Sequence, residues 1–220
     1  MKITTLSSGS TGNSYVLADS TGSQLLLECG IKYEKIVPHI DFEKLEAVLI
    51  SHSHQDHSMS KSKFSDFYTI VSPETHIAKS VLCFQNWLVC PIECSHNVDC
   101  FGYIIRNKIE KKNILFCTDT SNLPRVVDHH FDCMMLECNY SYDKMLDNSQ
   151  ANKLTSDGYK NHLALELLVD WLRLRECKPT HLMAIHLSNN GNLDKDLAEQ
   201  QLKQFATHFC FAQKGGTVEI

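Results

Sequence analysis

Residues 45–50 read LEAVLI and residues 52–57 read HSHQDH, and these two runs together decide the fold of the chain. The apolar run predicts a buried β-strand, which places the polar run on the loop leaving the carboxyl end of that strand. Three imidazoles and one carboxylate in so short a turn would compete for the same hydrogen-bond partners if no ligand were present. A bound metal ion resolves this crowding. We therefore predict metal ligands at His52, His54, Asp56 and His57.

The composition favours one globular domain. The chain has 220 residues, of which 43% are hydrophobic, and we expect a single domain over residues 1–220. No run of about 18 apolar residues occurs, and the opening MKITTLSSGS lacks the apolar segment of a secretory signal. We therefore expect a cytoplasmic protein with no membrane partner. The 10 cysteines are scattered singly, which favours buried thiols over a disulfide framework.

The charge balance argues against broad electrostatic binding of nucleic acid. The chain carries 21 Lys and Arg against 26 Asp and Glu, a formal net charge of −5. Proteins that bind nucleic acid mainly through charge have a basic footprint, which this composition lacks. Any contact with a polynucleotide must be local. Two divalent cations bound in a cleft would supply positive charge there.

Short strands dominate the first half of the chain, and strands mix with helices in the second half. The predicted strands span residues 2–6, 14–19, 24–29, 45–50, 68–71, 87–93, 101–107, 113–118, 131–137, 180–185 and 217–220. The predicted helices span residues 73–83, 162–176 and 193–205. This order favours an α+β fold of two mixed sheets flanked by helices over a doubly wound parallel fold.

Further ligand-type residues follow other apolar runs. His96 follows the strand that ends near Glu93, Asp119 follows ILFCT, and His186 follows LMAI. Any one of them alone would be interpreted as a cap or a surface residue, but strand ends of this kind can direct several side chains to one point. Together with HSHQDH they favour a shared metal site. Imidazole and carboxylate suit zinc and also manganese or iron, so the ligand types leave the metal open.

An alternative metal site is a zinc knuckle. Cys90, Cys94, His96 and Cys100 cluster in the sequence, and thiolates with imidazole are typical ligands of structural zinc.

Candidate substrate contacts lie near the motif. The loop SSGSTGN at residues 7–13 is rich in small residues, which lets backbone amides approach a phosphate closely. Its candidate substrate-binding residues are Ser10 and Asn13. Gly and Ser also form turns that bind nothing. Lys61 follows the metal motif and either touches a substrate backbone or lies on a solvated surface.

The order of these ligands resembles that of the metallo-β-lactamase superfamily. More narrowly, LSSGSTGNSYVL at residues 6–17, NHLALELL at 161–168 and AIHLSNN at 184–190 resemble the short WalJ/YycJ-type nucleases, relatives of ribonuclease Z. The resemblance implies a four-layer αβ/βα sandwich. It also implies a site of two divalent metal ions, with His52, His54 and His96 on the first, Asp56, His57 and His186 on the second, and Asp119 bridging them.

The resemblance also implies an activity. A hydroxide held between the two ions would attack a phosphodiester, with Asp56, Asp119 and His162 as catalytic residues. His162, with Asn161 as N-cap, is predicted in the first turn of a helix, where it would bind the phosphate or protonate the leaving oxygen. The long arm that grips tRNA in many ribonuclease Z proteins is absent from the sequence, which disfavours tRNA processing.

Several functions remain open at this point. The leading hypothesis is a DNA-directed exonuclease, with DNA favoured over RNA. The alternative is a hydrolase of cyclic nucleotides or other small phosphodiesters. Hydrolysis of a thioester or lactam, or a metal-binding module without turnover, is less favoured. The sequence leaves the oligomeric state open, with a homodimer among the options.

Overall fold

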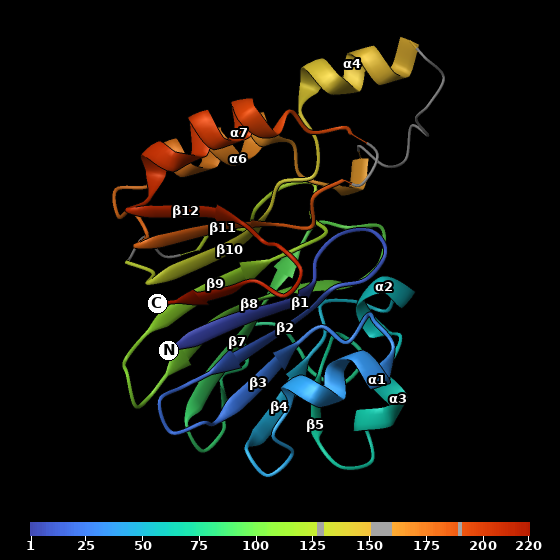
Figure 1. Cartoon of the computed structure of the whole chain (residues 1–220), viewed down its shortest axis with the longest axis vertical. Coiled ribbons are helices and arrows are strands. Elements are labelled where there is room, and N and C mark those ends of the chain that lie inside the picture. Colours follow the sequence, from blue (N-terminus) through green and yellow to red (C-terminus); the bar gives the residue numbers. More distant parts are fainter. Residues whose placement is uncertain (127–129, 151–159, 189–190) are drawn as a thin grey trace.

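The computed structural model describes residues 1–126, 130–150, 160–188 and 191–220. Two mixed β-sheets pack face to face, and helices cover the outer face of each sheet (Figure 1). This arrangement confirms the predicted α+β fold with four layers.

The first sheet has the strand order β13-β1-β2-β3-β4-β5. Its strands are β1 (Lys2–Ser7), β2 (Ser14–Ala18), β3 (Gln24–Leu27), β4 (Leu45–Leu49), β5 (Thr69–Val71) and β13 (Thr217–Glu219). β13, β1, β2 and β3 pair antiparallel, whereas β3, β4 and β5 pair parallel. The short helices on this side are α1 (Tyr33–Ile36), the 3-10 turn Val37–His39, α2 (Gln55–Ser58) and α3 (Lys61–Phe64).

The second sheet has the strand order β12-β11-β10-β9-β8-β7-β6. Its strands are β6 (Leu82–Cys83), β7 (Trp87–Cys94), β8 (Cys100–Asn107), β9 (Asn113–Cys117), β10 (Cys133–Glu137), β11 (His181–Ile185) and β12 (His208–Phe211). β9 to β12 are parallel, and β6 to β9 antiparallel. Helices on this side are α4 (Tyr142–Gln150), α6 (Leu165–Arg173), α7 (Lys195–Leu202) and the 3-10 turn Lys203–Phe205.

Alternation along the strands builds separate apolar layers. Successive side chains of a strand point to opposite faces, so Leu25 packs between the two sheets while Leu26 packs outward against the α1 side. In β10, Met135 enters the layer between the sheets, and Met134 enters the layer beneath α6. A strand covered on both faces is expected to be apolar throughout, as its sequence CMMLE is until its last residue.

The helix predicted over residues 73–83 is wrong. The Thr75 hydroxyl accepts a hydrogen bond from the Ser72 amide at 3.0 Å and donates to the Ile70 carbonyl at 2.8 Å, which offers the backbone an alternative to a helix. Lys79 then adopts a left-handed φ of 65°, and the segment ends in the short strand β6. The sequence reasoning also missed β12, α1, α3 and α4.

The helix predicted to begin at His162 begins later. α6 starts at Leu165 with Ala164 as its N-cap, so the predicted N-cap at Asn161 is also wrong. The Leu163 carbonyl accepts from the Asn139 amide at 3.0 Å, and the Leu165 amide donates to the Tyr140 carbonyl at 2.8 Å. These bonds hold the chain extended beside the end of β10 before the helix can start. In the described part of the chain, no helix is long and apolar enough to span a bilayer.

Candidate metal centre

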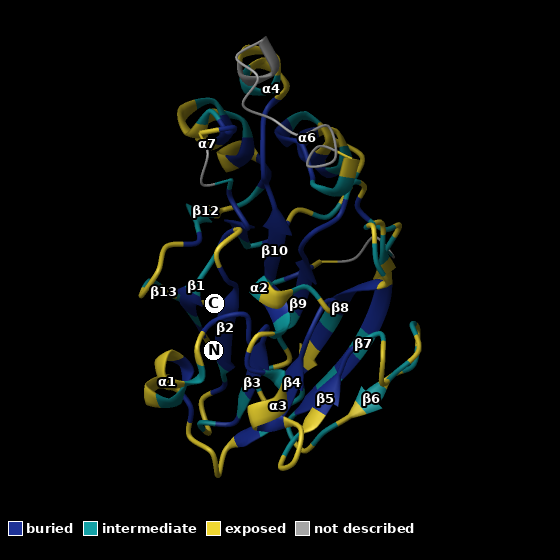
Figure 2. Ribbon diagram, turned by 90° about the vertical axis from the view of Figure 1, so that its right-hand side faces the viewer, coloured by how far each residue is buried: buried dark blue, intermediate teal, exposed yellow. Residues whose placement is uncertain are grey.

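The seven predicted metal ligands gather at one edge of the two sheets. In the view of Figure 2, α2 lies in front of that edge. The motif follows β4, His96 lies between β7 and β8, Asp119 follows β9, and His186 follows β11. The ligand-type atoms form three groups, each with its atoms within 4.8 Å of one another. The first is His52, His54 and His96, the second is Asp56, His57, Asp119 and His186, and the third, which shares two members with the second, is Asp119, Glu137, His162 and His186.

The first group is made of three imidazoles. His54 Nδ1 lies 3.4 Å from His96 Nε2, and the ring of His52 lies 4.5 Å from that of His54. The other ring nitrogens are held from outside, because His52 Nδ1 contacts Ser51 Oγ at 2.9 Å and His96 Nδ1 contacts the Asn161 carbonyl at 3.0 Å. Such outer contacts fix which nitrogen of each ring faces the ligand.

The first group favours neutral imidazole. Burial, together with the neighbouring His57, lowers the pKa of His52 to about 2. Burial also lowers the pKa of His96. His52 Nε2 is buried and has no hydrogen-bond partner. An unpaired nitrogen on a neutral ring is available as a metal ligand.

Asp119 lies between the two groups. Its Oδ1 is 3.3 Å from His57 Nε2 and 3.2 Å from His186 Nδ1, and its Oδ2 is 3.9 Å from His52 Nε2. Asp56 completes the second group, with Oδ2 3.3 Å from His57 Nε2 and 3.7 Å from His186 Nε2. One carboxylate thus faces both groups, which is the placement expected of a bridging ligand.

Protons balance the charge of the second group in the absence of metal. Burial opposes a charged His186, but Asp119, Asp56 and Glu137 together outweigh it and raise the pKa of His186 to about 10. Burial likewise disfavours ionised Asp119, yet His186 and His57 hold its pKa well below the usual range. A divalent cation would replace these protons on the ligands.

The residues present fit two metal ions. The buried Nε2 atoms of His52 and His186 lack hydrogen-bond partners, one in each group. Imidazole nitrogen and carboxylate oxygen are natural ligands for zinc and also suit manganese or iron. The arrangement could therefore hold two ions on opposite sides of Asp119.

Glu137 is a site residue that the sequence reasoning missed. It ends β10 with no exposed surface, and its Oε1 accepts from His162 Nδ1 at 2.7 Å and from His186 Nδ1 at 2.9 Å. Its Oε2 accepts from the amides of Thr120 at 2.8 Å and Leu163 at 3.2 Å. These four donors occupy the carboxylate, so Glu137 orients His186 rather than binding metal itself. A charged residue ending the buried run CMMLE was the available signal.

Glu28 has a similar role beside His57 and was also missed. The fully buried carboxylate accepts from the Ser51 amide at 3.0 Å and lies 3.5 Å from His57 Nδ1. Glu28, Asp119 and His186 all have left-handed backbone, with φ of 60°, 46° and 51°. Such conformations are strained for residues with a side chain, and they concentrate at functional sites.

His162 lies at the margin of the centre, before α6. Burial lowers its proton affinity, but the Glu137 carboxylate outweighs burial and raises the pKa of His162 above its usual value. Its side chain is 22% exposed, and its ring stacks on that of His186 with centroids 5.3 Å apart. His162 can therefore reach both the solvent and the buried ligands.

The predicted substrate residues take different positions. Asn13 is 1% exposed, and its amide nitrogen lies 3.1 Å from His57 Nε2 and 3.3 Å from the Asp56 carbonyl, which favours support of the motif over contact with substrate. Ser10 is exposed on the same loop. Lys61 forms an ion pair with Glu74 beside a cavity that reaches His52.

The zinc knuckle alternative is wrong. His96 turns toward His54, and no described group of clustered ligand atoms contains a cysteine. The Cys94 and Cys100 thiols instead lie within the second sheet.

Comparison with known proteins identifies the fold. No protein-family model and no curated protein matches this sequence. The metallo-β-lactamase fold protein YhfI from Bacillus subtilis superposes with a TM-score of 0.75 at 17% identity, over 100% of this chain and 99% of that one. The short form of human tRNase Z superposes with a TM-score of 0.66 at 14% identity, over 100% and 99% of the two chains. A diphosphatase from the PhnP family superposes with a TM-score of 0.68 at 14% identity, over 100% of this chain and 97% of that one. This chain has the metallo-β-lactamase fold.

Proposed function

We propose that the protein is a metal-dependent phosphodiesterase with two ions in the centre described above. The observation that carries this proposal is the pair formed by His162 and Glu137 at 2.7 Å at the margin of the metal centre, because the Glu137 carboxylate raises the pKa of His162 and so favours an imidazole that can donate a proton. A proton donor beside two cations suits a reaction in which negative charge develops on a leaving oxygen.

Each residue of the centre has its own proposed role in metal binding or proton transfer. His52, His54 and His96 would hold one ion, and Asp56, His57 and His186 the other, with Asp119 shared. When bound, the ions would activate water and withdraw charge from the phosphate oxygens. Glu137 accepts the Nδ1 proton of His162, which leaves Nε2 as the nitrogen that donates to the leaving oxygen. A thioester needs no donor of this kind, because a thiolate leaves without a proton. A lactam nitrogen does need one, so the pair argues against thioester hydrolysis rather than against lactam hydrolysis.

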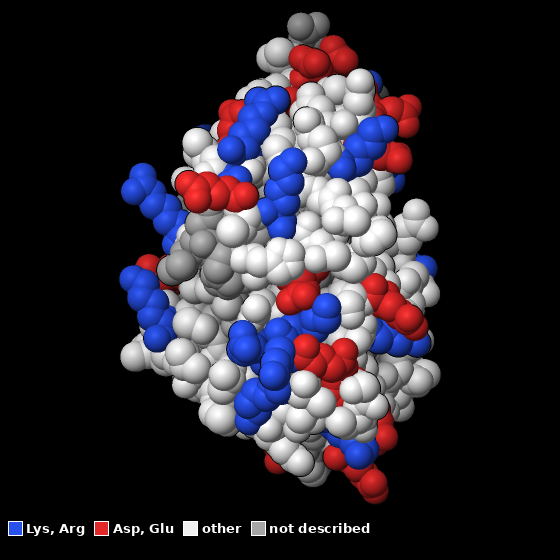
Figure 3. Space-filling view, turned by 90° about the vertical axis from the view of Figure 1, so that its left-hand side faces the viewer, with Lys and Arg blue, Asp and Glu red and all other residues white. Residues whose placement is uncertain are grey.

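Within this class we propose DNA, cut from its ends, as the leading substrate. The resemblance of residues 6–17, 161–168 and 184–190 to WalJ/YycJ-type nucleases supports this choice, and tRNase Z among the structural neighbours shows that the fold accommodates nucleic acid. On the face shown in Figure 3, Lys and Arg stand among Asp and Glu, and several basic side chains gather in the lower middle of the view. We expect contact with DNA near the metal edge, where the two cations would lie.

A small phosphodiester is the second candidate, and one cavity favours it. The cavity has a volume of about 260 Å³, and His52, Ser53, Lys61, Glu74 and Asp99 are among the residues that line it. This volume lies at the lower end of small-molecule sites and suits one compact group rather than a polymer. The diphosphatase among the structural neighbours is consistent with a small substrate.

One assay separates the two substrates. The purified protein, stripped with a chelator and reloaded with zinc or manganese, is incubated with end-labelled linear DNA, with closed circular DNA and with cyclic nucleotides. Release of nucleotides from linear DNA alone supports the exonuclease. Hydrolysis of cyclic nucleotides alone supports the second candidate. One result would overturn the proposed class of enzyme: the protein shows no metal-dependent turnover of any of these substrates, and the Asp119→Asn variant gives the same rates as the wild type.

A further inference from the structure

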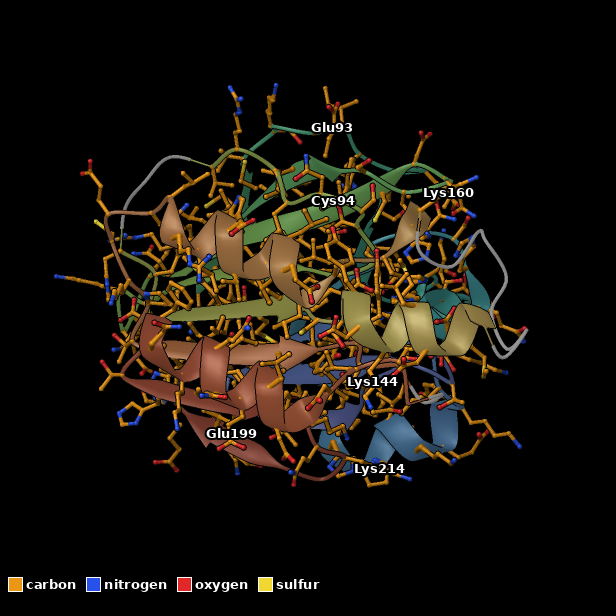
Figure 4. All side chains as sticks on the ribbon, turned by 90° about the horizontal axis from the view of Figure 1, so that it is seen from above. Glu93, Cys94, Lys144, Lys160, Glu199 and Lys214 are labelled. Carbon is orange, nitrogen blue, oxygen red and sulfur yellow. The ribbon has the colours of Figure 1, made fainter. Side chains whose placement is uncertain are left out.

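Three thiols gather beneath the loops that carry two of the metal ligands. Cys94 ends β7, Cys100 begins β8, and Cys117 ends β9, and all three are free. A Cβ atom on Gly102 would lie 2.7 Å from Cys117 Sγ and 3.1 Å from Cys94 Sγ, so the glycine makes room for both sulfurs. In Figure 4, Glu93 lies at the outer margin of the sheet and Cys94 lies inside it.

Cys94 and Cys100 face each other directly. They are register partners in the antiparallel pairing of β7 with β8, so their side chains lie on the same face of the sheet. Residues opposite each other on antiparallel strands have Cα atoms roughly 4.5 to 5.5 Å apart. Disulfides form at Cα separations of about 4.4 to 6.8 Å. The two cysteines can therefore be joined without moving the strands.

A small oxidant can reach Cys94. This residue is half-buried and, with Cys100, lines a surface hollow of about 560 Å³. Cys100 itself is only 3% exposed, so it acts as the second thiol. Cys117, in contrast, has no exposed surface. We propose that Cys94 and Cys100 form an oxidation site that closes to a disulfide and weakens the first metal group.

The chemistry needs only hydrogen peroxide as co-reactant. The Cys94 sulfur attacks the peroxide O–O bond, which gives a sulfenic acid and one water. The Cys100 sulfur then attacks the sulfur of that acid, forms the S–S bond and releases a second water. Two thiols are oxidised, and one peroxide is reduced to two waters. A dithiol reductant reverses the bond by exchange.

The bond would act on the site through the backbone. The loop between the two cysteines carries His96, two residues after Cys94. The Cys100 thiol contacts the carbonyls of Thr118 at 3.9 Å and Asp119 at 3.7 Å, and oxidation removes its S–H group. A disulfide would therefore change the conformation of the loop that carries His96 and remove a contact at the end of the strand that precedes Asp119. His96 is itself oriented by its contact with the Asn161 carbonyl at 3.0 Å, and losing an outer contact of this kind typically weakens metal binding by about 10- to 100-fold.

The test has two readouts, of which only the second rests on the proposed metal site. The full chain is treated with a small excess of peroxide, free thiols are blocked, and peptides are mapped by mass spectrometry. Zinc alone is then titrated into the reduced and the oxidised protein. We expect a Cys94–Cys100 link that dithiothreitol reverses, and at least about tenfold weaker binding of one zinc ion after oxidation.

Matched variants secure the interpretation. Cys94→Ser and Cys100→Ser should each abolish the effect of peroxide on zinc affinity, whereas Cys90→Ser, on the same strand, should leave it intact. A link between Cys94 and Cys117, or no link, would overturn the assignment. A Cys94–Cys100 link with unchanged zinc affinity would overturn the proposed consequence. Neither result depends on phosphodiesterase activity, so failure of the proposed function would be seen separately.

Discussion

Glu137 holds His162 through a hydrogen bond of 2.7 Å between Oε1 and Nδ1. The same oxygen accepts from His186 Nδ1 at 2.9 Å. One buried carboxylate therefore orients both the proposed proton donor and a proposed metal ligand. Its charge also favours the protonated form of His162, since it raises the pKa of that imidazole.

Replacing Glu137 with Gln should impair both functions of this carboxylate. The shape is kept but the charge is lost, so the pKa of His162 falls and the acid form disappears at lower pH. We expect turnover to drop about 10- to 100-fold and the alkaline limb of the pH profile to move toward lower pH. Steady-state rates across the pH range check this. An unshifted alkaline limb would contradict the role given to the pair.

Replacing His162 with Asn should separate chemistry from metal binding. His162 is assigned to proton donation, and removing a general acid costs about 10²- to 10⁴-fold in rate. Metal content, measured by mass spectrometry of the elements, should stay at the wild-type value. The exposed His39→Asn variant serves as control, with rate and metal content unchanged. Loss of metal in His162→Asn would instead make His162 a ligand.

Replacing Gly30 with Ala should displace the metal motif without touching a ligand. A Cβ at this position would lie 1.6 Å from the Asp56 carbonyl oxygen, so the backbone of α2 must shift. Metal content and turnover should both fall by at least about tenfold, as they do when supporting contacts are lost. Gly22→Ala is the control, because its Cβ meets nothing within 4 Å. This control should lose roughly 1 kcal/mol of stability, because Gly22 has a positive φ that a residue with a side chain adopts less readily. Its metal content should equal that of the wild type.

The metal-free protein should lose stability as the pH rises. The folded pKa of His186 is about 10, above the unfolded value of 6.5, so its contribution is complete below pH 6.5 and is lost as the pH approaches 10. The midpoint of urea unfolding after chelator treatment should fall between pH 7 and pH 10. Saturating zinc should reverse the slope, because the metal replaces the proton. A metal-free midpoint that increases over this range would contradict the electrostatic account.

The sequence predicted the layers and the clustering of seven ligand-type residues because both depend on local patterns. Apolar runs of strand length and the polar residues directly after them identify β4, β9 and β11, and Asp119 and His186 follow from that. The sequence did not identify residues whose role depends on contacts with distant parts of the chain. Glu137 ends an apolar strand without any motif around it, and Glu28 acts only through the backbone turn that brings it to His57.

The errors have the same physical origin. The segment 73–83 has helical composition, but one threonine hydroxyl and the pairing of β6 with β7 determine its path. α6 begins at Leu165 and not at the predicted His162, because Glu137, Asn139 and Tyr140 form hydrogen bonds with the backbone that precedes the helix. A local side-chain hydrogen bond with strand pairing in the first place, and hydrogen bonds to the end of β10 in the second, outweighed the helix preference of the sequence.

The central claim is that the centre holds two metal ions across Asp119, and the ion count per chain tests it most directly. Purified protein is reloaded with zinc, freed of excess metal and analysed for zinc and protein in the same sample. The account predicts two ions per chain in the wild type and fewer in Asp119→Ala, with the fold retained by circular dichroism. A wild-type protein that binds no zinc, or that binds as much zinc as Asp119→Ala does, would contradict it.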